Sequence, residues 1–188
     1  ALLASYQFDA PSLPLFEIVP RSGDGRSYAT LDPAVNGRNG RRPVYVLTSG
    51  RTFSAGEGFA FIMQERRRAE IIGEKTPGAA NPGRPYPIGT WLSVTVPNGQ
   101  VRGAVSGLNW EGSGVTPDVN TKSDDALRTA QMRALRELLK AAPLGAWQDS
   151  LKRHLETLEG GRISEDRGRH GFQGSSGAHL SGPGSLGR

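Results

Sequence analysis

A strand–helix–strand pattern between residues 43 and 72 constrains the fold more than any other feature of the chain. Residues 43–48 form a short apolar run with β-branched side chains between polar loops, which is typical of a buried strand. Residues 53–65 have the spacing of a mostly buried helix, and 69–72 form a second buried strand. Two strands joined by a helix within about 30 residues predict a parallel pair with a crossover connection, and therefore an α/β fold.

Further elements are expected on both sides of this unit. On its C-terminal side, the proline-rich stretch 73–89 predicts a long loop, and the alternation over 90–96 predicts a strand. Asn98-Gly99 predicts a hairpin turn that leads into a partner strand over 101–105. Ser123 is expected to cap a helix that ends near 142, and a second helix is predicted over 144–158.

The first 42 residues carry weaker signals. Residues 2–8 are consistent with the end of a helix, 13–19 with a strand, and 21–42 with an exposed loop. The opening apolar run Ala1-Leu2-Leu3-Ala4 is too short for a signal peptide or a membrane span, so we interpret it as the end of an element that begins earlier.

Composition divides the chain into two parts. Residues 1–158 are expected to form the C-terminal part of one catalytic domain. Residues 159–188 are rich in Gly, Ser and Arg and nearly lack large apolar residues, so this tail is predicted to be disordered, or foreign sequence.

Charge and cysteine content exclude some classes of function. The net charge of +5 is mild, and the basic clusters at 38–42 and 66–68 lack the interleaved aromatic residues of nucleic-acid sites. The chain has no cysteine, which excludes disulfides, zinc fingers and thiol catalysis.

Ser54 is the strongest candidate for chemistry. It stands where a buried strand turns into a buried helix, so its hydroxyl would lie beside the free amides at the positive end of the helix dipole. The amide of Ala55 could then hold a developing oxyanion. The local pattern has a second interpretation, because Ser54 and Glu57 also fit a capping box in which the serine only ends the helix.

Four ordered blocks carry a resemblance to a known family. They lie at 44–49, 52–57, 68–83 and 109–119, and include Thr-Phe-Ser-Ala-Gly-Glu and Asn-Trp-Glu-Gly-Ser-Gly-Val-Thr-Pro-Asp-Val. Over residues 1–158 the chain resembles the tail-specific protease family, which includes carboxyl-terminal processing peptidases, the tricorn protease core and interphotoreceptor retinoid-binding repeats. The resemblance implies a crotonase-like (ClpP-like) α/β spiral with C-terminal helices.

The resemblance also assigns roles to residues. Ser54 falls on the nucleophile and Ala55 on the oxyanion amide. The segment Gly78, Ala79 and Ala80, expected to contact substrate, stands where processing peptidases have Gly-Lys-Gly, so their general-base lysine is absent. In the tricorn-like branch the triad is Ser, His and Glu, and Glu111 falls on the glutamate. Phe53 and Trp110 are expected to be packing residues.

The general base is not identified within the chain. Lys75 matches a variable position of the family. None of the three histidines, His154, His170 and His179, is placed to act as the general base. In the tricorn-like branch the histidine and a second oxyanion donor lie upstream, so the chain by itself is expected to be inactive.

The resemblance implies a serine peptidase that acts on peptide or protein substrates, with no metal or cofactor, and suggests export or a periplasmic location by analogy. Oligomeric state is left open. A noncatalytic ligand- or peptide-binding domain on the same scaffold is the main alternative, and an acyl-CoA enzyme of the crotonase type is a weaker one.

Overall fold

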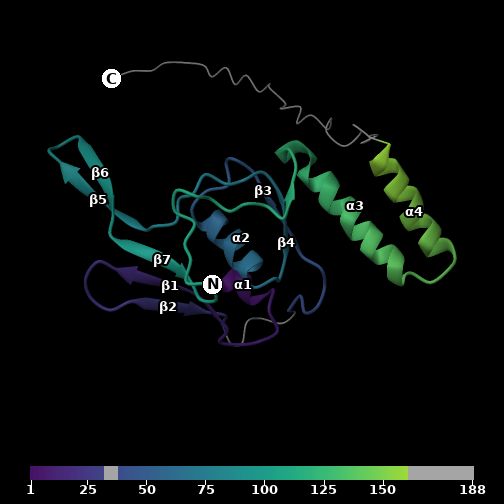
Figure 1. Ribbon diagram of the computed structural model, residues 1–188, viewed down its shortest axis with the longest axis horizontal. Helices are drawn as coiled ribbons and strands as arrows, with labels where there is room; N and C mark the ends of the chain where they lie inside the picture. Colours follow the sequence, from purple (N-terminus) through teal and green to yellow (C-terminus); the bar gives the residue numbers. More distant parts are fainter. Residues whose placement is uncertain (32–37, 161–188) are drawn as a thin grey trace, which may run out of the picture.

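The computed structural model describes residues 1–31 and 38–160 and shows a mixed α/β arrangement of three small sheets and four helices in that part of the chain (Figure 1). Most of the predicted tail, with His170 and His179, lies outside the described residues. The elements are α1 Leu2–Ser5, β1 Pro14–Pro20, β2 Arg26–Ala29, β3 Tyr45–Thr48, α2 Ala55–Glu65, β4 Glu70–Gly73, β5 Gly83–Ile88, β6 Leu92–Pro97, β7 Gly99–Gly103, β8 Val119–Asn120, α3 Ser123–Ala141 and α4 Ala146–Glu159.

The predicted strand–helix–strand unit is confirmed. Strands β3 and β4 pair in parallel with Tyr45 opposite Glu70, α2 connects them, and β8 adds a third parallel strand beside β4. Successive residues of β4 point to opposite faces of the sheet. Ile71 joins the buried cluster that includes α2, and Ile72 packs with α3, so two helices cover the two faces of β4 (Figure 1).

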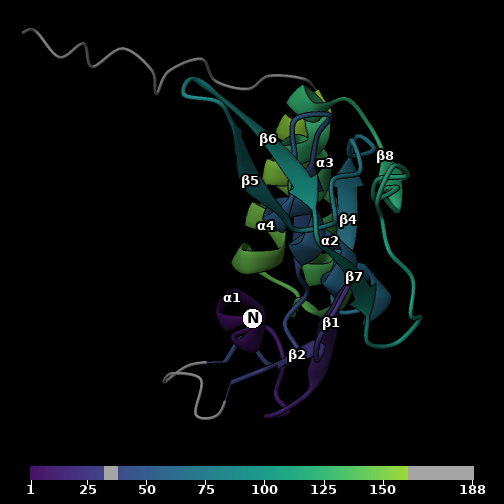
Figure 2. The same ribbon diagram turned by 90° about the vertical axis from the view of Figure 1, so that its left-hand side faces the viewer.

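The two C-terminal helices are also confirmed, and they form a pair on the outer side of the parallel sheet (Figures 1 and 2). Arg133 of α3 makes an ion pair with Glu70 of β4, which fixes the helix against the strand. The predicted cap is wrong by one residue: Lys122 is the N-cap, and Ser123 is the first helical residue. The Ser123 amide donates to the Glu74 carboxylate instead (3.1 Å).

The predicted loop over 73–89 and the predicted hairpin at Asn98 are both wrong in part. Residues of β5 pair antiparallel with β6, so the second half of the loop is a strand. Its prolines are tolerated because no third strand joins this two-stranded arm in the described part of the chain. At Asn98 the backbone bonds to Pro82 and Arg21 rather than closing a turn, and β7 leaves the arm to pair with β1.

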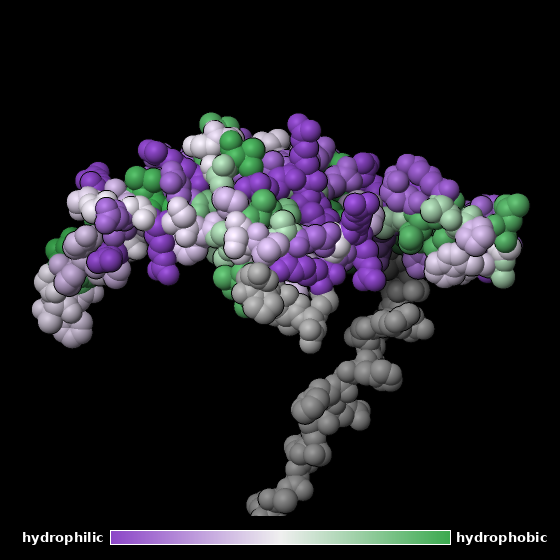
Figure 3. All heavy atoms as spheres, turned by 90° about the horizontal axis from the view of Figure 1, so that it is seen from below, coloured by the Kyte–Doolittle hydropathy of each residue, from purple (hydrophilic) through white to green (hydrophobic). Residues whose placement is uncertain are grey.

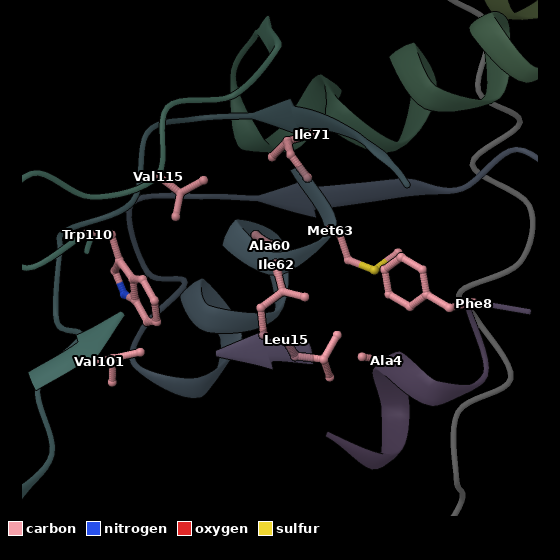
Figure 4. Close-up of a cluster of buried hydrophobic side chains, with 10 residues drawn as sticks. All are labelled: Ala4, Phe8, Leu15, Ala60, Ile62, Met63, Ile71, Val101, Trp110 and Val115. Atoms are coloured by element: carbon pink, nitrogen blue, oxygen red, sulfur yellow. The ribbon is translucent and has the colours of Figure 1, made fainter. Parts of the chain in front are cut away.

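A short strand also interrupts the predicted loop of residues 21–42. Strand β2 pairs with β1, and the rings of Phe16 and Tyr28 stack across the pair with centroids 4.6 Å apart. Leu15 of β1 is fully buried and joins the core cluster with Ala60 and Met63 of α2 (Figure 4). This sheet therefore closes the side of α2 that the parallel sheet leaves open.

The β5–β6 arm extends from one end of the molecule and the α3–α4 pair from the other (Figures 1 and 3). In Figure 3, hydrophobic residues reach the surface in several separate patches. Among the described residues, no helix is both long enough and apolar enough to cross a bilayer.

Candidate active site

Ser54 lies at an exposed, sharp corner between β3 and α2. Its backbone has φ 51° and ψ −115°, a conformation that side chains rarely adopt and that costs of order 1–3 kcal/mol. The turn is fixed by two bonds between Ser49 and Thr52, each 2.9 Å long. A strained strand-to-helix turn presents the nucleophilic serine in enzymes of the α/β-hydrolase fold.

The capping-box interpretation is confirmed. The Ser54 side chain faces the amide of Glu57, and the Glu57 carboxylate accepts a hydrogen bond from the Ser54 amide (2.9 Å). The two interpretations are compatible, because capping holds the Ser54 hydroxyl beside the amides at the start of α2.

Glu57 has a larger role than sequence reasoning gave it. Its carboxylate is fully buried and accepts four hydrogen bonds. The donors are the Ser54 amide, the Thr76 hydroxyl (2.6 Å), the Gly78 amide (2.7 Å) and the Ala79 amide (2.9 Å). This one side chain therefore ties the Ser54 corner to the loop that follows β4. The capping-box spacing was its only signal in the sequence, since the other donors lie about 20 residues away.

We predict that the Glu57 network makes the protein less stable in acid. Burial by itself raises the pKa of Glu57, but the bonds from Thr76, Ala79, Gly78 and Ser54 lower it, and the net pKa lies below the ordinary 4.5. The unfolded chain therefore binds the proton first, and the stabilisation, complete above about pH 4.5, is lost as the pH falls through the lowered pKa.

Urea unfolding between pH 6 and pH 3 measures this effect. The unfolding free energy of the wild type should fall more steeply below pH 4.5 than that of Glu57→Gln, by at most about 1.4 kcal/mol per pH unit. Equal slopes for the two proteins would contradict a lowered pKa at Glu57.

Glu111 approaches the same loop from the glycine-rich segment. One of its oxygens accepts hydrogen bonds from the amides of Ala80 (2.7 Å) and Asn81 (2.8 Å). The Gly112 amide donates to the Gly78 carbonyl (2.8 Å), which brings the two segments side by side. The amides of Gly78, Ala79 and Ala80 are therefore bonded internally, and a peptide at this loop would meet its carbonyls or side chains.

Close packing at Gly114 holds the glycine-rich segment against Thr76. A Cβ at Gly114, where φ is +69°, would lie 1.9 Å from the Thr76 carbonyl oxygen. Thr76 is buried and links the two segments through Val115, whose amide donates to the Thr76 hydroxyl (2.8 Å). Gly112 has nearly the same φ, +68°, but open space around it.

We therefore predict unequal effects of two alanine substitutions. Gly114→Ala should lower the unfolding free energy by more than about 3 kcal/mol because the backbone must shift, whereas Gly112→Ala should cost only about 1 kcal/mol from its positive φ. Urea denaturation of both variants measures the difference, and equal losses would show that the contact at Gly114 is not close.

An apolar cleft of about 470 Å³ opens beside Ser54. Ser54, Ala55 and Ala80, three of the predicted site residues, line it. The rest of its wall comes largely from apolar residues of α1, β1, α2 and β7, with Trp110. Trp110 is a packing residue as predicted, 5% exposed with its ring 5.0 Å from that of Phe61, whereas Phe53 is 61% exposed, so that prediction is wrong.

The structure places no described histidine at this cleft. His154 is exposed on α4, which lies on the far side of α3 from α2 (Figure 1). Lys75 is exposed and does not line the cleft. The described residues therefore provide the serine, the helix amides and two glutamates of the candidate site.

Three solved structures show similarity to the chain. A lipoprotein from Streptococcus agalactiae matches 72% of this chain and 48% of its own, with 17% identity and a TM-score of 0.54. A putative peptidase from Parabacteroides merdae ATCC 43184 matches 65% and 41%, with 19% identity and a TM-score of 0.52. A photosystem II D1 C-terminal processing protease matches 66% and 32%, with 22% identity and a TM-score of 0.49.

The first two of these structures share the fold of this chain, which spans less than half the length of each of the three. The model of peptidase family S41 matches residues 9–121, which make up more than half of the chain and include Ser54, Glu57 and Glu111. The match confirms the resemblance found in the sequence: the chain belongs to peptidase family S41.

Proposed function

We propose that this chain carries the nucleophile of a serine peptidase that hydrolyses extended polypeptides. The observation that carries the proposal is the exposed corner at Ser54, where a strained backbone presents the hydroxyl beside helix amides and an apolar cleft. In this proposal Ser54 is the nucleophile, the Ala55 amide is an oxyanion donor, and Glu111 supports the site.

The reaction proceeds by acyl transfer. The Ser54 oxygen attacks the carbonyl carbon of the scissile bond while a general base takes the hydroxyl proton, and a tetrahedral oxyanion forms. A hydrogen bond from the Ala55 amide to this oxyanion is worth roughly 3 kcal/mol of barrier. The base then gives its proton to the leaving amine, and water, activated by the same base, releases the acyl group from Ser54.

The general base comes from outside the described residues in this proposal. A neutral histidine is the group whose ordinary pKa suits this role near pH 7, and Glu111 would orient it or complete its hydrogen-bond network. A second oxyanion donor would come with the histidine from a preceding part of a longer protein. We assign the unit β3–α2–β4 to a crotonase-like spiral that such a protein completes.

Labelling with a fluorophosphonate tests the proposal. In a longer form of the protein that includes the preceding residues, we expect one adduct, which peptide mapping places on Ser54, and only slow labelling of the chain by itself. Ser54→Ala should lose the adduct, and Ser113→Ala, which removes an exposed serine of the glycine-rich segment, should keep it.

Three results would overturn parts of this assignment. An adduct that survives in Ser54→Ala would exclude Ser54 as the nucleophile. Fast, stoichiometric labelling of the chain by itself would instead show that no further base is needed. No adduct in any form, together with peptide binding, would favour a noncatalytic binding domain.

A further inference from the structure

The indole N–H of Trp110 is a buried hydrogen-bond donor that the described part of the fold does not use. Trp110 is 5% exposed, and within residues 1–31 and 38–160 its Nε1 has no hydrogen-bond partner. Leaving a buried donor unpaired costs about 1–3 kcal/mol, and buried tryptophans usually find a partner for this group. A phenylalanine would fill the core without that cost, so packing alone does not account for an indole at this position.

The residue that carries this donor forms part of the wall of the Ser54 cleft. Trp110 lines the cleft together with Ser54, Gly58 and Ala80. The six-membered ring of Trp110 lies against Gly58, where an added Cβ would approach two ring carbons to 3.2 Å. Figure 4 shows the indole nitrogen on the side of the ring that faces away from the core residue Ala60.

The chemistry of the cleft favours a neutral acceptor with apolar neighbours. Its walls are mostly apolar, and no lysine or arginine side chain is among the described residues that line it. Such a wall suits the carbonyl oxygen of a peptide better than a carboxylate or a phosphate, since an anion there would lose its hydration without a counter-charge. The nearby amides of Ala79 and Ala80 are already bonded to Glu57 and Glu111.

We propose that Trp110 is a ligand-binding residue whose indole N–H donates to a backbone carbonyl oxygen of an extended peptide in the Ser54 cleft. The choice of a peptide rests on the proposed function, whereas the unpaired donor and the apolar wall do not. The indole nitrogen is covered in the free chain, so binding involves a small shift of the cleft wall. The apolar wall beside it takes an aliphatic side chain of the same peptide.

Indole ¹⁵N–¹H NMR of the chain tests the proposal, with acetyl-Ala-Leu-Ala-Ala amide as the probe. The chain has three tryptophans, and Trp91→Phe and Trp147→Phe identify the signals of the two exposed ones. We expect the Trp110 indole proton to shift downfield with peptide concentration and to saturate. Trp110→Phe keeps an aromatic ring in the core but removes the donor, and should weaken binding about tenfold; Trp91→Phe should leave it unchanged.

The outcomes separate this inference from the assignment of Ser54. No saturable shift of the Trp110 signal up to millimolar peptide overturns the inference, and so does binding by folded Trp110→Phe within twofold of wild type. If Trp110→Phe does not fold, the wild-type titration still decides. A Trp110 shift in the chain, together with no labelling of Ser54 in the longer form of the protein, would leave the inference standing and overturn the peptidase assignment.

Discussion

Replacing Ser54 with alanine or with glycine is expected to lower peptide hydrolysis by on the order of 10⁴-fold or more, while the two substitutions change stability in opposite directions. Both remove the oxygen that would attack the substrate. The measurement is kcat for a peptide substrate, in whichever form of the protein hydrolyses it. Activity of either variant within tenfold of wild type would exclude Ser54 as the nucleophile.

The stability of the two variants tests whether the Ser54 corner is strained. Alanine keeps the Cβ at φ 51° and loses the helix cap, so Ser54→Ala should lower the unfolding free energy by about 1 kcal/mol. Glycine adopts a positive φ freely, and as a helix cap it is only a few tenths of a kcal/mol worse than serine. Ser54→Gly should therefore raise the unfolding free energy by about 1 kcal/mol. Urea denaturation measures both, and a glycine variant no more stable than the alanine variant would show that the corner is relaxed.

Replacing Glu57 with glutamine is expected to destabilise the fold by about 3 kcal/mol, despite nearly identical shape. Each carboxylate oxygen of Glu57 faces two donors: Oε1 the Thr76 hydroxyl and the Gly78 amide, and Oε2 the Ser54 and Ala79 amides. A glutamine must turn its NH₂ toward one of these pairs, which leaves two buried or partly buried donors without their acceptor. Urea unfolding at pH 7 measures the loss.

Glu137→Gln provides a matched control for Glu57→Gln. Glu137 is exposed on α3 and pairs with Lys140 at the surface, so its substitution should change stability by less than about 1 kcal/mol. If Glu57→Gln is as mild as this control, the buried carboxylate does not hold the two segments together.

Local patterns in the sequence predicted much of the fold. Strand β3 takes up the last four residues of the apolar run 43–48, β4 is shifted by one residue from the run 69–72, and the apolar spacing of α2, α3 and α4 was sufficient to find three helices. Strand β5 of the arm was missed because Pro85 and Pro87 normally argue against a strand, and they are tolerated because no third strand joins the arm within residues 1–31 and 38–160. Asn98-Gly99 was misjudged because its partners, Arg21 and Pro82, lie in other segments.

The sequence predicted those parts of the candidate site whose residues are close neighbours in the chain. Ser54 and Glu57 lie within four residues of each other, so the corner could be inferred from the local sequence pattern alone. Two features depend on packing between distant segments: the bond from Thr76 to the Glu57 carboxylate, and the lack of a partner for the Trp110 nitrogen among the described residues. Roles of this second kind leave no periodic signal in the sequence.

The order of synthesis gives the Glu57 network a further consequence. The segment that contains Ser54 cannot complete this network by itself, because Glu57 accepts from donors 19 to 22 residues further along, and Thr76 in turn is bonded to Val115, 39 residues beyond it. A ribosome must therefore release the chain past Val115 before the whole network can form. Until then the corner that we propose for attack on peptide bonds has only its local hydrogen bonds to hold it.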